Sequence, residues 1–348
     1  MRPRVLFLAR GHGFGHAARD LRIIRAMRVR RPDVEVTVLA SGSAATFLAL
    51  HGEPFTDMDI DDTEDMSPAA AQRVWQLMDR FEPFDLTVSD EVVWALPYCA
   101  RKWGRRAILL TDWFYRELGD PAADSFLDHA GEILLLDFEI AHPGPVSTSA
   151  VITPMGPVVA DFTVDRSTAR RRLGIAPDAT VTVLTVGGMS TMLDNQRIAE
   201  VTVAAHRDDP SRHLYVLADG ADGQHVTFTG YTDRPELYYR AADVVVTNAN
   251  GTVTCDLVWN RIPVVAMTHP DVTYPDSFGT RVSRLSEAGL IHHFTATGSP
   301  DDLRPLLAAA TPPAPLPDDL EWTTGDRVAA HLLDRLDYMV AKDRHDRT

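Results

Sequence analysis

Short apolar runs rich in Val, Ile and Leu alternate along the chain with longer stretches whose apolar residues recur every three or four positions. The short runs predict buried strands and the periodic stretches predict amphipathic helices. Repeated alternation of strand and helix is typical of parallel sheets covered by helices on both faces. The expected strands are residues 4–8, 34–40, 85–89, 106–111, 133–137, 180–186, 213–218, 226–229, 243–247 and 263–267. The expected helices are residues 19–31, 43–51, 92–103, 167–173, 194–206, 235–241, 253–260, 278–288 and 326–343.

A cluster of prolines and glycines divides this pattern into two halves. Residues 141–161 contain His-Pro-Gly-Pro and Thr-Pro-Met-Gly-Pro, and such a cluster favours a connection between domains. Each half begins with a strand, a glycine-rich loop and a helix. We therefore expect an α/β protein with two Rossmann-like domains, residues 1–155 and 156–325, and a ligand site in the cleft between them. Residues 326–348 form a C-terminal helix with one apolar stripe, which we expect to pack back on the first domain.

Composition and charge narrow the range of partners. Of the 348 residues, 45% are hydrophobic and 24% are charged, which is an ordinary globular balance, and the net charge of −15 argues against a nucleic-acid partner. Apolar runs are too short for a transmembrane segment or a signal peptide, so we expect a soluble, cytoplasmic protein. Neither the distant pair Cys99 and Cys255 nor the acidic pairs Asp61-Asp62 and Asp301-Asp302 supply a full set of ligands, so we expect no metal and no cofactor.

The most distinctive local sequence is Gly-His-Gly-Phe-Gly-His-Ala-Ala-Arg at residues 11–19, directly after the first expected strand. Its glycines allow a tight turn close to a ligand, and the following helix N-terminus favours negative charge. The Gly-x-Gly-x-x-Gly pattern of NAD-binding proteins is incomplete here. A histidine at such a turn can act as a base, so His16 and secondarily His12 are candidates; the alternative is that they only hydrogen-bond the loop. The expected acceptor-side residues of this loop are His12, Gly13, Phe14, Gly15 and Arg19.

Acidic residues follow two further expected strands of the first half. Asp90 and Glu91 come after residues 85–89, and Asp112 comes after residues 106–111. Ligands of open α/β sheets bind at the carboxyl ends of strands. Asp90 is therefore an acceptor-side candidate and Asp112 a catalytic candidate, although an acid at such a place is more often a helix cap or a surface group.

Two loops of the second half could hold a diphosphate and a ribose. Residues 186–191, Val-Gly-Gly-Met-Ser-Thr, could present backbone amides and hydroxyls to a diphosphate, although Gly-Gly also marks a simple tight turn. Residues 248–256 end on Asp256, whose carboxylate could accept ribose hydroxyls or serve only as an acid in the first turns of a helix. The donor-binding candidates here are Gly187, Gly188, Met189, Ser190, Asn250, Gly251, Thr252 and Asp256.

With these motifs the chain resembles the two-domain GT-B fold glycosyltransferases that include the peptidoglycan N-acetylglucosaminyltransferase. Its first half is still more similar to the glycosyltransferase-like N-terminal region of plant L-arabinokinases, which carries a Gly-His-Gly-Phe-Gly-His-Ala-x-Arg loop like residues 11–19. The resemblance implies that Gly187-Gly188 receives the donor diphosphate and that backbone around Tyr231 clasps the base. Asp256 falls where the family usually has a ribose-binding glutamate, and Asp276-Ser277 falls where donor-sugar contacts are expected without the familiar glutamines. These departures leave the base and the sugar open.

The resemblance implies a metal-independent glycosyltransferase of the hexosyltransferase type, which moves a sugar from a UDP- or dTDP-sugar to a hydroxyl of a small-molecule or lipid-linked acceptor. His16 would be the general base or line the reacting centre. Two alternatives remain: a nucleotide-sugar hydrolase of the same fold, because similar loops occur in enzymes that deliver water, and a non-catalytic nucleotide-sugar-binding protein. A kinase is disfavoured because the Gly-x-x-x-x-Gly-Lys-Ser/Thr pattern is absent. The acceptor, the stereochemical outcome and the oligomeric state stay open.

Overall fold

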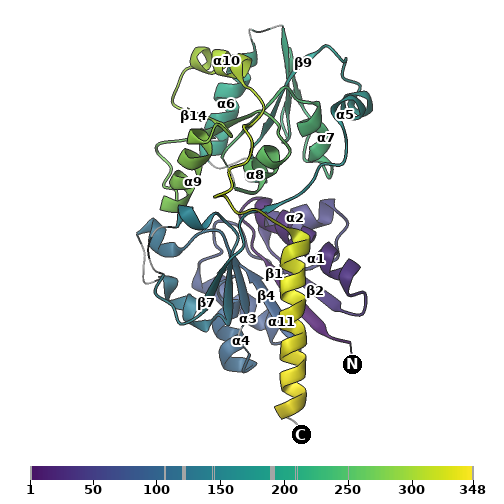
Figure 1. Cartoon of the computed structure of the whole chain (residues 1–348), viewed down its shortest axis with the longest axis vertical. Coiled ribbons are helices and arrows are strands. Elements are labelled where there is room, and N and C mark those ends of the chain that lie inside the picture. The colour runs from purple at the N-terminus through teal and green to yellow at the C-terminus, as the bar shows by residue number, and fades with distance from the viewer. Residues whose placement is uncertain are drawn as a thin grey trace. The chain divides into compact units, whose positions relative to one another are not determined.

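A computed structural model describes residues 2–105, 107–119, 123–142, 144, 146–188, 193–207, 209, 211–249 and 251–346 (Figure 1). The chain forms two compact units, each a parallel sheet covered by helices. The first unit comprises Met1–Val159, Pro275–Ser277 and Leu320–Thr348, and the second comprises Ala160–Tyr274 and Phe278–Asp319. Among the described residues, no helix combines the length and the apolar stretch that a membrane span needs.

The first unit is built on a parallel sheet of strand order β3-β2-β1-β4-β5-β6-β7. Its strands are β1 (Arg4–Ala9), β2 (Glu35–Ala40), β3 (Thr56–Asp57), β4 (Leu86–Asp90), β5 (Ile108–Thr111), β6 (Glu132–Leu135) and β7 (Val151–Pro154). The central strand β1 pairs with β2 on one side and with β4 on the other. The chain order of the strands therefore reverses between β1 and β4, the point where open α/β sheets bind their ligands.

Helices cover both faces of this sheet. They are α1 (Gly15–Arg30), α2 (Gly42–Leu50), α3 (Pro68–Met78), α4 (Ala95–Lys102) and α11 (Gly325–Asp346), with short 3-10 helices η1 (Tyr115–Leu118), η2 (Ala123–His129) and η3 (Glu139–Ala141). The C-terminal helix α11 packs along α1 (Figure 1). Its apolar stripe, Val328, Leu332 and Leu336, lies fully buried in the same core cluster as Ile23 and Ile24 of α1. The two-stranded pair of β8 (Val158–Val159) and β15 (Thr323–Thr324) also joins the C-terminal segment to this unit.

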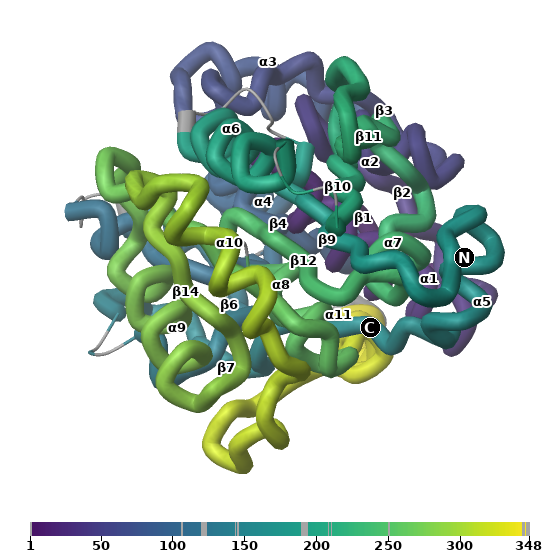
Figure 2. The backbone as a smooth tube through the Cα atoms, turned by 90° about the horizontal axis from the view of Figure 1, so that it is seen from above, coloured from purple at the N-terminus to yellow at the C-terminus, as the bar shows by residue number. Residues whose placement is uncertain are grey.

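The second unit repeats the same plan, with a parallel sheet of order β11-β10-β9-β12-β13-β14. Its strands are β9 (Thr180–Thr185), β10 (Arg212–Val216), β11 (Val226–Phe228), β12 (Val244–Thr247), β13 (Val264–Thr268) and β14 (His292–Thr295). Figure 2 shows β10, β9 and β12 following one another across this sheet. The helices are α5 (Arg166–Leu173), α6 (Leu193–Arg207), α7 (Pro235–Ala241), α8 (Gly251–Trp259), α9 (Asp276–Glu287), whose first two residues belong to the first unit, and α10 (Pro300–Ala309). This is the Rossmann strand order, with its reversal between β9 and β12.

Two expectations about the first half are wrong in detail. Residues 141–161 were expected to form a connection between domains; the two units do divide within this stretch, between Val159 and Ala160, but the residues before that point include strands β7 and β8 of the first unit. Strand β7 lies at the edge of the sheet, where Pro154 costs no ladder hydrogen bond. The expected helix 19–31 begins at Gly15 instead. Its N-cap residue Phe14 provides no side-chain hydrogen bond, so the usual polar start signal is missing.

Candidate functional site

The loop of residues 11–19 and the end of β4 meet at the strand-order reversal of the first sheet. Strand β1 ends at Ala9, which is the register partner of Asp90 at the end of β4. Because α1 begins at Gly15, His16 and Arg19 lie one helical turn apart on the same face. The fold therefore directs both side chains at Asp90.

Asp90 is the centre of a buried hydrogen-bonded cluster. Its carboxylate is fully buried and accepts hydrogen bonds from Arg19 Nε at 2.6 Å and from Arg19 Nη2. His16 Nδ1 lies 2.8 Å from Asp90 Oδ1. Burial by itself would raise the pKa of Asp90, but Arg19 and His16 hold it well below its usual range. Because an ionised Asp90 can only accept, we assign the Nδ1 proton to His16. Arg19 Nη2, which lies 2.9 Å from Nδ1, then donates to Asp90 Oδ1 and not to the ring, and Nε2 is the acceptor of the ring.

His16 combines burial with a charged partner. Its side chain is 10% exposed. Burial lowers the pKa of His16, but the carboxylate of Asp90 outweighs this effect, and the net shift is upward. A histidine whose Nδ1–H is held by a carboxylate is oriented to accept a proton at Nε2. The expected role of His16 as a general base is compatible with this geometry and stays a prediction.

Glu91 and Arg10 form a second layer beside this pair. Arg10 Nη1 donates to Glu91 Oε2 at 2.8 Å, and Trp113 Nε1 donates to the same oxygen at 2.9 Å. Glu91 has a positive φ of 53°, a strained conformation for a non-glycine residue that is concentrated at functional sites. The same carboxylate oxygen lies 3.8 Å from His16 Nε2. Burial and the nearby Asp112 raise the pKa of Glu91. His16 and Arg10 act in the opposite direction, but the net shift of this pKa is upward.

Asp112 joins the cluster from the end of β5. Its carboxylate lies 3.2 Å from Arg19 Nη1, and its side chain is 25% exposed, against 4% for Glu91 and 0% for Asp90. It is therefore the most open of these three acids. Its expected catalytic role stays a prediction, but the structure brings it together with Arg19 and His16.

These groups also contain one candidate cation site that the acidic pairs of the sequence did not suggest. Ligand atoms of His16, Glu91 and Asp112 all lie within 4.8 Å of one another. However, Arg10 already bonds Glu91, and Arg19 lies beside Asp112. A metal ion there would have to displace two buried guanidinium groups, so the local charge disfavours it.

The start of the glycine-rich loop is held by the N-terminus of α2. Gly11 N donates to Ser41 Oγ at 3.0 Å, and His12 N donates to Ser43 Oγ at 3.1 Å. A Cβ at Gly11 would lie 2.7 Å from Ser41 O, and Gly13 has a φ of +83°. Both positions therefore need glycine, one for close approach and one for its backbone conformation.

The remaining loop residues lie around this turn. His12 is exposed, while Phe14 is half-buried and packs on Phe47 with ring centroids 5.5 Å apart. Gly15 is the first residue of α1. Of the two histidines, His16 rather than His12 is the one bonded to a buried carboxylate.

In the second unit, the expected diphosphate loop follows β9 at the other strand-order reversal. Gly187 has a φ of +71°, which suits glycine. Asn248, after β12, donates through Nδ2 to Val186 O at 3.3 Å and to Asn195 Oδ1 at 2.8 Å. This residue ties the loop after β12 to the loop after β9 and to α6. Met189, Ser190 and Asn250 lie outside the described residues.

Gly251 and Thr252 form the first turn of α8, and Arg281 of α9 lies beside them. A Cβ on Gly251 would lie 3.4 Å from the guanidinium carbon of Arg281, which is 5% exposed. A helix N-terminus next to a guanidinium favours an anion. Arg281 was not expected from the sequence, because the helical pattern around it carries no motif.

Asp256 has a structural partner that the sequence did not suggest. It lies in α8, is 4% exposed, and accepts a hydrogen bond from Ala160 N at 2.9 Å. Asn260, one turn later, accepts from Phe162 N at 2.8 Å. One oxygen of Asp256 therefore fixes the segment that enters this unit, and its expected ribose contact stays a prediction.

The remaining donor candidates are placed as follows. Tyr231 follows β11 and packs half-buried against the core of the second unit. Asp276 and Ser277 are the first two residues of α9, and Ser277 is 1% exposed. Their contacts with a donor stay predictions.

The chain resembles solved structures of glycosyltransferases over nearly its whole length. No family model and no curated protein sequence matches the chain. The glycotransferase of kitacinnamycin matches with a TM-score of 0.60 and 17% identity over 100% of this chain and 99% of that one. Arabidopsis thaliana UGT89C1 complexed with UDP-L-rhamnose matches with a TM-score of 0.63 and 13% identity over 98% and 99%. MurG of Acinetobacter baumannii matches with a TM-score of 0.57 and 14% identity, over 95% of this chain and 99% of that one. The chain has the GT-B fold.

The GT-B fold confirms the expected fold class and the similarity to the peptidoglycan N-acetylglucosaminyltransferase, because MurG is among the matching structures. The resemblance to the L-arabinokinase region stays a prediction. At identities of 13–17% the match concerns the fold. Roles for individual residues of this GT-B chain therefore rest on its own geometry.

Three residues of the first site were not expected from the sequence: Arg10, Asp20 and Asp65. Arg10 bonds Asp65 as well as Glu91. Asp20 is fully buried beside Asp90, and burial together with that carboxylate raises the pKa of Asp20 well above its usual range. A protonated Asp20 would place no further charge in the cluster. No sequence motif marks these residues, since their partners are distant along the chain.

Proposed function

We propose that this protein is a metal-independent glycosyltransferase that moves a sugar from a UDP- or dTDP-sugar to a hydroxyl group of a small-molecule or lipid-linked acceptor. The observation that carries the proposal is the buried His16–Asp90 hydrogen bond, 2.8 Å long, at the strand-order reversal of the first sheet. The GT-B fold supports it, because the compared structures are glycosyltransferases. One of them has been crystallised with UDP-L-rhamnose and with quercetin. A cytoplasmic location stays a prediction from the sequence.

The proposed chemistry is a single displacement at the anomeric carbon. His16 Nε2 accepts the proton of the acceptor hydroxyl while the hydroxyl oxygen bonds to the anomeric carbon. The bond from that carbon to the diphosphate oxygen breaks, and its electron pair leaves with the nucleoside diphosphate. Asp90 stabilises the imidazolium that forms, and Arg19 keeps Asp90 ionised.

We assign the donor to the second unit. The amides of Gly187-Gly188 and the N-terminus of α8 would face the diphosphate, and Arg281 beside Gly251 would add positive charge. These groups stabilise the departing charge without a metal ion. Asp112, the most open acid of the first cluster, would line the acceptor side.

The test is a mass balance of donor and products. The protein is incubated with UDP- and dTDP-sugars, with and without a panel of phenolic, saccharide and lipid-linked acceptors, in the presence and absence of EDTA. The proposal expects sugar transfer to an acceptor, equal release of nucleoside diphosphate, and no effect of EDTA.

Other outcomes assign a different function. Stoichiometric free sugar without any acceptor would indicate the hydrolase. Tight donor binding without turnover, unchanged in His16→Ala, would indicate a binding protein. If calorimetric titrations detect no binding of UDP, dTDP or GDP, the transferase, the hydrolase and the binding protein are all ruled out.

A further inference from the structure

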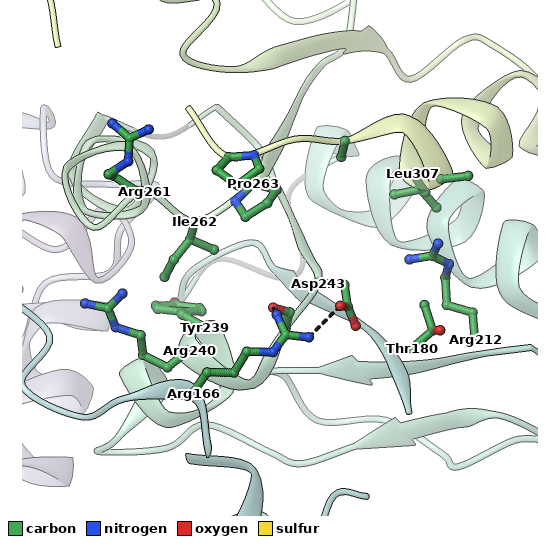
Figure 3. A pocket seen from close by; sticks show the side chains of 14 residues that line it. Arg166, Thr180, Arg212, Tyr239, Arg240, Asp243, Arg261, Ile262, Pro263 and Leu307 are labelled. Atoms are coloured by element: carbon green, nitrogen blue, oxygen red, sulfur yellow. Dashed lines mark hydrogen bonds and ion pairs between the residues drawn. The ribbon is translucent and has the colours of Figure 1, made fainter. Parts of the chain in front are cut away.

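A pocket of about 510 Å³ lies at the amino edge of the second sheet (Figure 3). Thr180 and Arg212 are the first residues of β9 and β10, while Asp243 and Pro263 directly precede β12 and β13. These four strands are neighbours in the sheet. The end of α10, including Leu307, adds an apolar wall. The volume is in the range of small-molecule pockets, roughly 300–1,000 Å³.

This pocket is separate from the proposed donor site. The donor loops follow the carboxyl ends of β9 and β12, whereas the pocket lies at the amino ends of the same strands. Strand β9 has six residues, and a strand rises about 3.3 Å per residue, so the two edges are roughly 20 Å apart. A ligand of the pocket would leave the donor loops unoccupied.

Four arginines line the pocket: Arg166, Arg212, Arg240 and Arg261 (Figure 3). Asp243 is the one acidic residue among the described lining residues. It is already paired, because Arg166 Nη2 bonds one of its oxygens and the buried Arg170 bonds the other at 3.0 Å. The remaining charge of the lining is positive, although the whole chain carries a net charge of −15.

Arg240 is held in place by neutral groups. It donates to Asn260 O at 3.1 Å and to Phe162 O at 3.0 Å, and it stacks over the Phe162 ring at 5.6 Å. Its Nε is buried and has no hydrogen-bond partner. The carbonyl oxygens orient this cation but carry no net charge, and Asp161, the carboxylate that acts on it electrostatically, lies outside the pocket lining, so an anion in the pocket would be attracted to Arg240.

Arg261 has a positive φ because it lies in the turn that ends α8, where Arg261 N donates to Val258 O at 3.0 Å and Ile262 N donates to Leu257 O at 2.9 Å. It follows α8 with a φ of +56°, at a position where helices usually place glycine or asparagine. Its side chain is exposed, and among the described residues no hydrogen bond or ion pair engages it. Arg212 likewise has no carboxylate within ion-pair distance among those residues; its contact is with Thr182 Oγ1 at 3.5 Å.

We infer that this pocket binds the phosphate group of a small phosphorylated ligand. Arginine donates in a planar fork that fits phosphate oxygens in pairs. Arg212, Arg240 and Arg261 supply donors that no carboxylate of the described lining consumes. Ile262 and Leu307 supply apolar surface for the body of the ligand. The ligand class is therefore a phosphate monoester.

The test uses the full chain and inorganic phosphate as the first probe, titrated by calorimetry against chloride at equal ionic strength. Phosphate should bind, and Arg212→Gln and Arg261→Gly should each weaken binding about tenfold, the effect of one charged hydrogen bond. Arg261→Gly should also unfold at the same temperature as wild type or higher, because glycine accepts the positive φ. A loss of binding in this variant is then not a loss of folding.

Controls locate the site and distinguish the source of phosphate. Arg197→Ala removes an exposed arginine that pairs with Glu200 outside the pocket, and it should leave phosphate affinity unchanged. UDP affinity should be unchanged in all these variants, which separates this pocket from the donor site. Tighter binding of glycerol 3-phosphate would indicate a soluble ester, and arginine-dependent sedimentation with vesicles that contain phosphatidic acid, a lipid phosphate monoester, would indicate a lipid headgroup. Phosphate binding that survives in both pocket variants, or no binding of any probe, would overturn the inference.

Discussion

Asp90 is the residue whose removal tests the first site most severely. Its fully buried carboxylate accepts hydrogen bonds from Arg19 and His16. Asp90→Asn keeps the volume and removes the charge, which leaves a buried guanidinium without its main partner. Breaking a buried ion pair in this way costs about 3–5 kcal/mol. Arg19 retains Asp112 at 3.2 Å, so we expect a loss near the lower end, about 3 kcal/mol, in a domain whose total stability is about 5–15 kcal/mol.

The assay is urea unfolding followed by tryptophan fluorescence, since Trp113 contacts Glu91 in this cluster. The pKa of Asp90 is lowered in the folded state. Its contribution is therefore present above the pKa of an unfolded aspartate, about 3.9, and is lost as the pH falls through the folded value. The difference between wild type and variant should persist from pH 7 to about pH 4 and shrink below it.

The matched control is Asp112→Asn, which removes a more exposed carboxylate from the same arginine. We expect it to cost about 1 kcal/mol or less. The reasoning is refuted if Asp90→Asn unfolds within about 1 kcal/mol of wild type at pH 7, or if Asp112→Asn costs as much as Asp90→Asn.

Four further predictions follow from individual contacts. Burial lowers the pKa of His16, but Asp90 outweighs this effect and the net shift is upward. The acid limb of the kcat/KM profile should therefore lie above about pH 6.5 in wild type and move to lower pH in Asp90→Asn. Acid limbs at the same pH in both proteins would show that Asp90 does not set the pKa of the catalytic base. Gly11→Ala should lose about 1–3 kcal/mol in urea unfolding, because its Cβ would lie 2.7 Å from Ser41 O; a neutral change would show that α2 can move away. Burial lowers the pKa of His142, but the flanking Asp137 and Glu117 raise it to about 9. This stabilisation is complete below about pH 6.5 and is lost as the pH rises through about 9, so unfolding titrations of wild type should lose up to about 3 kcal/mol more than those of His142→Gln over this range. Removing residues 325–348 deletes α11 and uncovers the apolar face of α1, including Ile23 and Ile24, against which it packs; the truncated protein should be insoluble, so a soluble, folded truncation would contradict the packing of α11 on α1.

Much of the fold can be predicted from the sequence, because the buried parallel strands are continuous apolar runs. Residues 4–8 and 180–186 are typical, and both form interior strands of their sheets. The position of His16 and Asp90 at the carboxyl ends of strands follows from the same pattern. What brings them into contact is the pairing of β1 with β4, which the strand order of Rossmann-like sheets provides.

Two helices that were not predicted, α3 and α10, have recognisable start signals in the sequence. Ser67 before Pro68 caps α3 by accepting from Ala70 N, and Ser299 with Asp302 forms a capping box at α10. These are recognisable helix starts. By contrast, α1 begins after Phe14 without a side-chain cap, so nothing local indicates that the helix starts four residues before the predicted position.

The electrostatics of the site could not be read from the sequence. Arg10, Asp65 and Glu91 are far apart along the chain and meet only through tertiary packing. The bond from Ala160 N to Asp256 joins residues 96 positions apart. Local periodicity contains no information on such pairs, and this is why the sequence suggested a ribose contact for Asp256 and did not suggest its structural one.

The most direct test of the account is the rate at which nucleoside diphosphate is released from a UDP- or dTDP-sugar in the presence of an acceptor, measured for wild type, His16→Ala and His12→Ala. A positioned general base contributes about 10²–10⁴-fold, so His16→Ala should be slower by that factor. His12→Ala should stay close to wild type, because residue 12 is exposed and His16 is the histidine of this loop that bonds Asp90. Equal rates in wild type and His16→Ala would contradict the account.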